Sequence, residues 1–105
     1  MPGRQRTRDY YHRTHPQAVA VIMERGFKDV SETFETDSAA RGVWFTDSLA
    51  SGGSTPSAFG SAVVAVSLPV PLAEGHFHTD DQGYREYLIP AIIVNRYPRR
   101  LARGP

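Results

Sequence analysis

The sequence predicts an α+β domain dominated by a β-sheet, with one main helix. Short stretches rich in aromatic and β-branched residues recur along the 105-residue chain, at residues 9–14, 42–47, 62–70 and 84–90. One further segment, residues 16–25, carries its apolar residues at helical spacing instead. The order of strand, helix, strand, loop, strand and strand is typical of an α+β domain.

The helix over residues 16–25 has recognisable ends. Thr14 and Gln17 have the spacing of a capping box, and Pro16 falls in the first turn, where its missing N–H costs nothing. Gly26 is expected to stop the helix in the left-handed conformation. One face of this helix is apolar and consists of Ala18, Val19, Ile22 and Met23.

The remaining segments are interpreted from composition. Residues 28–41 are polar and predict a loop, and residues 48–61, rich in Ser and Gly, predict a flexible loop or a short helix over a site. The apolar, β-branched residues 62–70 predict a central strand. Residues 71–82 predict irregular structure, and residues 91–97 either a further strand or a short turn.

Length and composition limit the class of protein. A chain of 105 residues is expected to form a single domain, with a core over about residues 10–97. The absence of cysteine excludes disulfides and thiolate zinc sites. The longest mainly apolar run, residues 62–72, is too short to span a bilayer, and no apolar segment follows the basic start as in a signal peptide. We therefore expect no membrane partner and a cytoplasmic location.

Arginines gather at both ends of a chain whose net charge is only +1. If the termini lie close together, these arginines form one basic patch that meets the phosphates of a nucleotide or a nucleic acid. The alternative is that they are solvated side chains with no partner. The arginines in question are Arg4, Arg6, Arg8 and Arg13 near the start, and Arg96, Arg99, Arg100 and Arg103 near the end.

An acidic residue occupies an unexpected position in the strand "YREYLIP". Glu86 shares strand parity with Tyr84 and Leu88, so its carboxylate lies on the same side as an aromatic and an aliphatic side chain. Either this is an edge strand with a solvated face, or the carboxylate is aimed at a ligand. Two other residues have similar alternatives. His12 is either a capped or packed histidine or a residue that binds a ligand. Trp44 is either a core residue or a platform on which a ligand stacks.

Other kinds of site fit the sequence less well. His76 and His78 share parity and precede Asp80 and Asp81, but no third ligand has clear spacing, so we predict no metal site. The Gly-rich stretch "SGGS" lacks the lysine of a phosphate loop, and no nucleophile turn accompanies a Ser, His and Asp set.

Three segments in this order, "YHRT" at 11–14, "GVWF" at 42–45 and "YREYLI" at 84–89, resemble the signature of the ADP-ribosyltransferase superfamily. The similar branch is the one that includes diphtheria toxin and the poly(ADP-ribose) polymerases. The spacer "AVAVIMERGF" at 18–27 also resembles the first helix of that family. The resemblance spans about residues 10–97 and implies an ADP-ribosyltransferase-like split β-sheet.

The resemblance also implies an activity, with NAD as co-substrate and a protein or nucleic-acid acceptor. Glu86 and His12 would be the catalytic residues: Glu86 stabilises the charge that develops on the ribose, and His12 binds a ribose hydroxyl. The backbone of Arg13 would hold the nicotinamide amide, and Trp44 would stack on the nicotinamide ring. The implied set of NAD-binding residues is His12, Arg13, Thr14, Trp44 and Phe45.

The chain departs from the family pattern at two positions, with Arg13 where many members have glycine and Trp44 where the pattern has Tyr. Two alternatives therefore stay open. One is an RNA 2′-phosphotransferase of the same fold, for which Arg13 would supply one of several basic side chains. The other is a non-catalytic module that binds a nucleotide or a nucleic acid.

Overall fold

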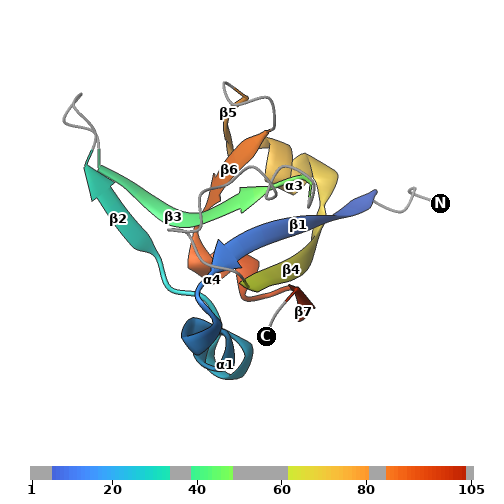
Figure 1. The fold of residues 1–105 in the computed structure, drawn as a ribbon. Helices are drawn as coiled ribbons and strands as arrows, with labels where there is room; N and C mark the ends of the chain where they lie inside the picture. The colour runs from blue at the N-terminus through green and yellow to red at the C-terminus, as the bar shows by residue number, and fades with distance from the viewer. Residues whose placement is uncertain (1–5, 34–38, 49–61, 81–84, 104–105) are drawn as a thin grey trace.

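The computed structural model of the chain describes residues 6–33, 39–48, 62–80 and 85–103. Over these residues the protein is an α+β domain in which three helices accompany a seven-stranded sheet (Figure 1). In chain order the elements are β1 (Thr7–Thr14), α1 (Pro16–Arg25), β2 (Val30–Thr33), β3 (Ala39–Thr46), β4 (Ala62–Pro69), α3 (Val70–Glu74), β5 (Phe77–Thr79), β6 (Glu86–Ile89), α4 (Ala91–Val94) and β7 (Arg99–Arg103).

All the strand pairs are antiparallel, and six strands follow the order β5-β6-β3-β1-β4-β7, with β2 paired to β3. β1 pairs with β4 along its whole length, from Thr7 opposite Pro69 to Thr14 opposite Ala62. Its pairing with β3 is limited to Tyr11 opposite Thr46. Beyond this pair the two strands diverge, β1 towards α1 and β3 towards β2 (Figure 1).

The core lies on the side of the sheet that the helices cover. Alternate residues of the central strands are buried there, because successive side chains of a strand point to opposite sides. Tyr10, Phe45 and Tyr87 are the largest of them, each at most 1% exposed. The rest of this core cluster is Phe27, Val43, Val64, Val66, Leu68, Ala73, Ile89, Ala91 and Val94.

The predicted strands at residues 9–14, 42–47 and 62–70 are confirmed within β1, β3 and β4, and the helix over residues 16–25 is confirmed as α1. The predicted strand at 84–90 appears as β6, with residue 84 outside the described ranges. β4 lies between β1 and β7, so its interior position agrees with its apolar sequence.

The predicted ends of α1 were wrong in detail. The N-cap residue is His15, and it makes no side-chain capping bond, so Thr14 and Gln17 do not form a capping box. Gly26 has φ +90° and ψ 179°, which is not the left-handed helical conformation, although its N–H does bond to the carbonyl of Ile22. A methyl group at Gly26 would lie 2.7 Å from Oδ1 of Asn95. The Asn95 side chain is held in place by hydrogen bonds to the backbone N–H and carbonyl of Phe27.

Three further expectations from composition need correction. Within residues 28–41 the chain forms β2 and the start of β3, which pair backbone to backbone and so need no apolar pattern. Residues 71–82 contain most of α3 and all of β5. Of the two alternatives for residues 91–97, the strand was wrong and a single helical turn, α4, follows Pro90. Most of the segment 48–61 lies outside the described residues.

Candidate functional site

The sheet brings the three signature segments together. β6, β3 and β1, which contain Glu86, Trp44 and His12, are consecutive neighbours in the sheet although they lie far apart in the sequence (Figure 1). Thr46 of β3 is the Cα partner of Glu86 on one side and of Tyr11 on the other. The single β1–β3 pair therefore stands directly beside the position of Glu86.

Glu86 belongs to a row of side chains that crosses four strands on the side of the sheet opposite the core. Its cross-strand partners are Thr79 on β5 and Thr46 on β3, and Tyr11 on β1 follows Thr46. We call Thr79, Glu86, Thr46 and Tyr11 the polar row; all four are half-buried. Because Tyr87, the next residue of β6, is fully buried in the core, the Glu86 carboxylate faces the other way.

Trp44 lies on the same side of the sheet and contacts His78, for which the sequence pattern suggests only metal binding. The ring centroids of Trp44 and His78 are 4.8 Å apart with an interplanar angle of 81°. The pairing of β5 with β6 is irregular between Phe77 and Thr79, so His78 is the extra residue of a bulge. Bulges redirect side chains, and parity counted along the sequence does not reveal them.

His12 lies on the core side of β1. Its ring is 5.3 Å from the ring of Phe27 and 5.8 Å from that of Phe45, centroid to centroid. Nδ1 lies 2.9 Å from the carbonyl oxygen of Trp44, and since a carbonyl only accepts, Nδ1 is the protonated nitrogen. Burial lowers the pKa of His12, and the hydrogen bond to Trp44 opposes this in part. The structure therefore does not bring the side chains of His12 and Glu86 together on one side of the sheet.

The other predicted NAD-binding residues divide between the two sides. Arg13 alternates with His12 along β1, so its side chain shares the side of Tyr11 and the polar row. Thr14, the last residue of β1, has the parity of His12 and is half-buried. Phe45 is 1% exposed and packs with Phe27 and His12, so its side chain belongs to the core.

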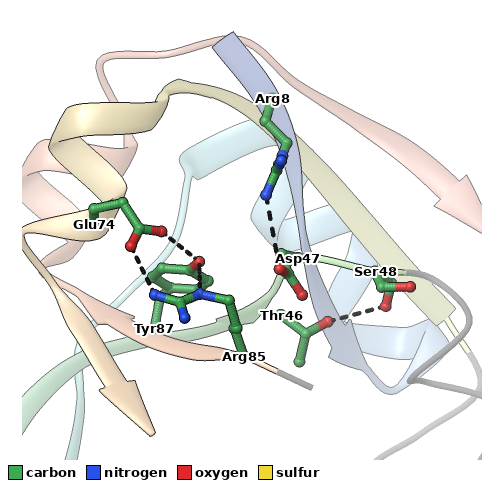
Figure 2. Close-up of polar contacts among 7 residues, drawn as sticks. All are labelled: Arg8, Thr46, Asp47, Ser48, Glu74, Arg85 and Tyr87. Atoms are coloured by element: carbon green, nitrogen blue, oxygen red, sulfur yellow. Dashed lines mark hydrogen bonds and ion pairs between the residues drawn. The ribbon is translucent and has the colours of Figure 1, made fainter. Parts of the chain in front are cut away.

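The two sequence neighbours of Glu86 belong to a second polar group, in which Arg85 and Tyr87 meet Glu74 of α3 (Figure 2). Arg85 donates from Nη2 to Oε1 of Glu74 at 2.7 Å and from Nε to the hydroxyl of Tyr87 at 2.9 Å. The Tyr87 hydroxyl donates to Oε2 of Glu74 at 2.7 Å. We call these three residues the Glu74 network. Sequence reasoning missed it, because nothing in the pattern around Glu74 indicates that α3 packs beside β6.

The protonation of the Glu74 network follows from its contacts. Burial, followed by the hydrogen bond to Glu74, raises the pKa of Tyr87 to about 12. The pKa of Arg85 is also raised, chiefly by its hydrogen bond to Tyr87. At neutral pH Tyr87 is therefore a neutral phenol that donates, and Arg85 is a cation.

Several of the terminal arginines are used inside the domain. Arg99 donates to the carbonyl oxygens of Ile22 and Met23 near the end of α1, at 2.8 and 3.2 Å. Arg100 makes a two-bond ion pair with Asp9, at 3.2 and 2.6 Å, which lowers the pKa of the Asp9 carboxyl. Arg99 and Arg100 therefore have partners within the domain, and the basic patch expected from the sequence stays a prediction.

Among the described residues no group of three or more His, Cys, Asp or Glu is arranged to hold a metal ion, and no helix is long and apolar enough to cross a membrane. Comparison with known proteins gives no match to any protein-family model, curated protein or solved structure. The candidate site is therefore defined by its own residues: the polar row around Glu86, with Trp44, His78 and Arg13 on the same side of the sheet.

Proposed function

We propose that the protein is an NAD-dependent ADP-ribosyltransferase in which Glu86 is the catalytic carboxylate. The observation that supports this proposal is the adjacency of β6, β3 and β1, with Glu86 and Trp44 on one side of the sheet. A carboxylate beside an indole suits a substrate that joins a sugar to a flat, cationic ring. Nicotinamide bound to ribose in NAD is such a substrate.

In the proposed reaction the bond between C1′ of the ribose and N1 of nicotinamide breaks, and its electron pair leaves with nicotinamide. Positive charge then develops on the ribose, as in glycoside cleavage. The acceptor's nucleophilic atom attacks C1′, forms the new bond and releases its proton to solvent. Glu86, which lies between its cross-strand partners Thr46 and Thr79, stabilises the developing charge, and preorganised charge of this kind is commonly the largest catalytic contribution.

The surrounding residues receive roles that agree with their positions. Trp44 stacks against nicotinamide, and His78 supports the indole through a T-shaped ring contact. His12 holds the Trp44 carbonyl from the core side of β1 and is a positioning residue in this proposal, instead of the ribose ligand that the resemblance implies. Arg13 supplies a positive charge on the side of the polar row. The acceptor is a protein or a nucleic acid.

Release of nicotinamide from NAD tests the proposal, measured by chromatography with calorimetry for NAD binding. The wild-type protein is expected to release nicotinamide, and Glu86→Gln to bind NAD normally while turnover falls by roughly 10²–10³. Glu24→Gln on α1, an exposed glutamate, is the matched control and should behave like the wild type. Full activity of Glu86→Gln contradicts the assignment, and binding without release favours a non-catalytic module.

The position of Arg13 keeps RNA 2′-phosphotransferase as a second candidate, because a guanidinium on the side of Glu86 suits an RNA phosphate. Incubation with NAD and an RNA oligonucleotide carrying one internal 2′-phosphate distinguishes the two functions. Loss of that phosphate identifies the phosphotransferase. Nicotinamide release with the 2′-phosphate intact supports ADP-ribosyl transfer.

A further inference from the structure

The residues on either side of Glu86 in the sequence are tied to one carboxylate. Arg85 and Tyr87 both bond to Glu74, each to a different oxygen and each at 2.7 Å, and they also bond to each other (Figure 2). The three contacts close a ring. Glu86 lies between the two tied residues, with its own side chain on the opposite side of β6.

The Glu74 network is anchored by aromatic packing. Tyr87 is fully buried, and its ring meets those of Tyr10 and Phe77 edge to face, with centroids 5.1 and 5.9 Å apart. The guanidinium carbon of Arg85 stands 4.0 Å from the centre of the Phe77 ring. Three partners therefore hold Arg85: the Glu74 carboxylate, the Tyr87 hydroxyl and the face of the Phe77 ring.

We infer that Glu74, Arg85 and Tyr87 are positioning residues, which fix the backbone on both sides of Glu86 and so aim its carboxylate along the polar row. In a strand, fixing the side chains at two positions on one side limits how far the strand can rotate about its axis. The residue between them then presents its side chain in one direction on the other side. A catalytic carboxylate needs this precision, since displacements of about 1 Å can cost 10²-fold in rate.

The catalytic part of this inference rests on the proposed function; the effect on the Glu86 side chain does not. The network also joins α3 to β6, so a role limited to holding α3 on the sheet is the competing explanation. That role predicts lower stability with an unchanged Glu86. A merely structural role would leave the rotamer of Glu86 unchanged. It would also not lower kcat at an unchanged KM.

The test uses two variants of the network and one matched control. Tyr87→Phe keeps the buried ring and removes the hydroxyl; Glu74→Gln keeps the shape and removes the charge. Asp9→Asn breaks the ion pair with Arg100, whose shortest N–O distance of 2.6 Å resembles the 2.7 Å of the Glu74–Arg85 pair. Circular dichroism establishes that each variant is folded before it is assayed.

Two properties are measured on each protein: the three-bond couplings about χ1 of Glu86 by NMR, and kcat and KM for nicotinamide release from NAD. In the wild type and Asp9→Asn, the couplings are expected to report one rotamer. In Tyr87→Phe and Glu74→Gln they should move towards averaged values. In the same two variants kcat should fall about tenfold, with KM changed by less than about twofold.

Each outcome decides the inference. If Glu86 keeps one rotamer in both network variants, the inference is overturned, whatever the activity. It is also overturned if the wild type is active and the couplings average in the two network variants, but these variants keep the wild-type kcat. If the wild-type protein releases no nicotinamide, the proposed function fails, and averaged couplings confined to the two network variants still support the positioning of Glu86.

Discussion

The Nδ1 atom of His12 donates a hydrogen bond to the carbonyl oxygen of Trp44 at 2.9 Å, joining two strands whose registered pairing is limited to Tyr11 and Thr46. In an antiparallel ladder a backbone N–H usually occupies such a carbonyl. Here a side chain does so, at the place where β1 and β3 diverge. His12 therefore joins β1 to β3. Its loss should lower the stability of the fold and should also displace the backbone at Trp44.

Replacing His12 with alanine should lower the free energy of unfolding by about 2–3 kcal/mol, because the change removes a hydrogen bond and the packing of the ring against Phe27 and Phe45. Urea denaturation followed by circular dichroism measures this loss. His15→Ala is the control: His15 is exposed and makes no side-chain capping bond, so its change should stay within about 0.5 kcal/mol. Equal losses for the two variants would show that His12 does not join the strands.

Stability should fall as pH drops below the ordinary histidine pKa. Burial lowers the pKa of His12 below 6.5, so the unfolded chain takes up this proton more readily than the folded one. The stabilisation is therefore complete above about pH 6.5 and is lost as pH falls through the folded-state pKa. Between pH 7 and 5.5 the loss should reach up to about 1 kcal/mol.

Urea denaturation of the wild type and His12→Gln at several pH values checks this dependence. The difference between the two profiles isolates the contribution of His12. The lowered pKa of Asp9 acts below its ordinary value of 3.8 and leaves this pH range unaffected. Parallel profiles for the two proteins would refute the prediction.

Two buried tyrosines should respond differently to loss of their hydroxyl groups. Tyr10 and Tyr87 are both fully buried, but within the described part of the chain the Tyr10 hydroxyl has no hydrogen-bond partner, whereas that of Tyr87 bonds Glu74 and Arg85. Tyr10→Phe should therefore be neutral or stabilise by up to about 1 kcal/mol, and Tyr87→Phe should cost about 1–3 kcal/mol. Thermal denaturation of the pair measures the contrast; similar losses in both would contradict it.

Trp44 should report nicotinamide directly, since it is the one tryptophan in the sequence. Adding NAD is expected to quench its fluorescence to saturation, because the indole stacks against the nicotinamide ring. ADP-ribose, which lacks that ring, is the matched ligand and should quench much less. Glu86→Gln should keep the quench, since that change removes charge without removing the stacking surface. Equal quenching by NAD and ADP-ribose would place the nicotinamide elsewhere.

The sequence alone determined the local elements whose signals are continuous along the chain. Residues 16–25 combine Pro at the start, Gly after the end and an apolar face, and these coincide with α1. The β-branched run in β4 identified an interior strand, because a strand buried on both sides needs apolar residues at every position. Strand parity also placed Glu86 on the same side as Leu88; both are half-buried, whereas Tyr87 between them is fully buried in the core.

Which side chains meet depends on how distant segments of the chain pack together. Polar segments such as β2 pair through backbone groups, which composition does not reveal. Parity along β1 separates His12 from Arg13, but the side that faces the core depends on where α1, α3 and α4 pack. Strand register produces the bulge at His78. The placement of α3 beside β6 brings Glu74 to Arg85 and Tyr87. These contacts between distant segments are set by the packing of the whole chain, so no local pattern carries them.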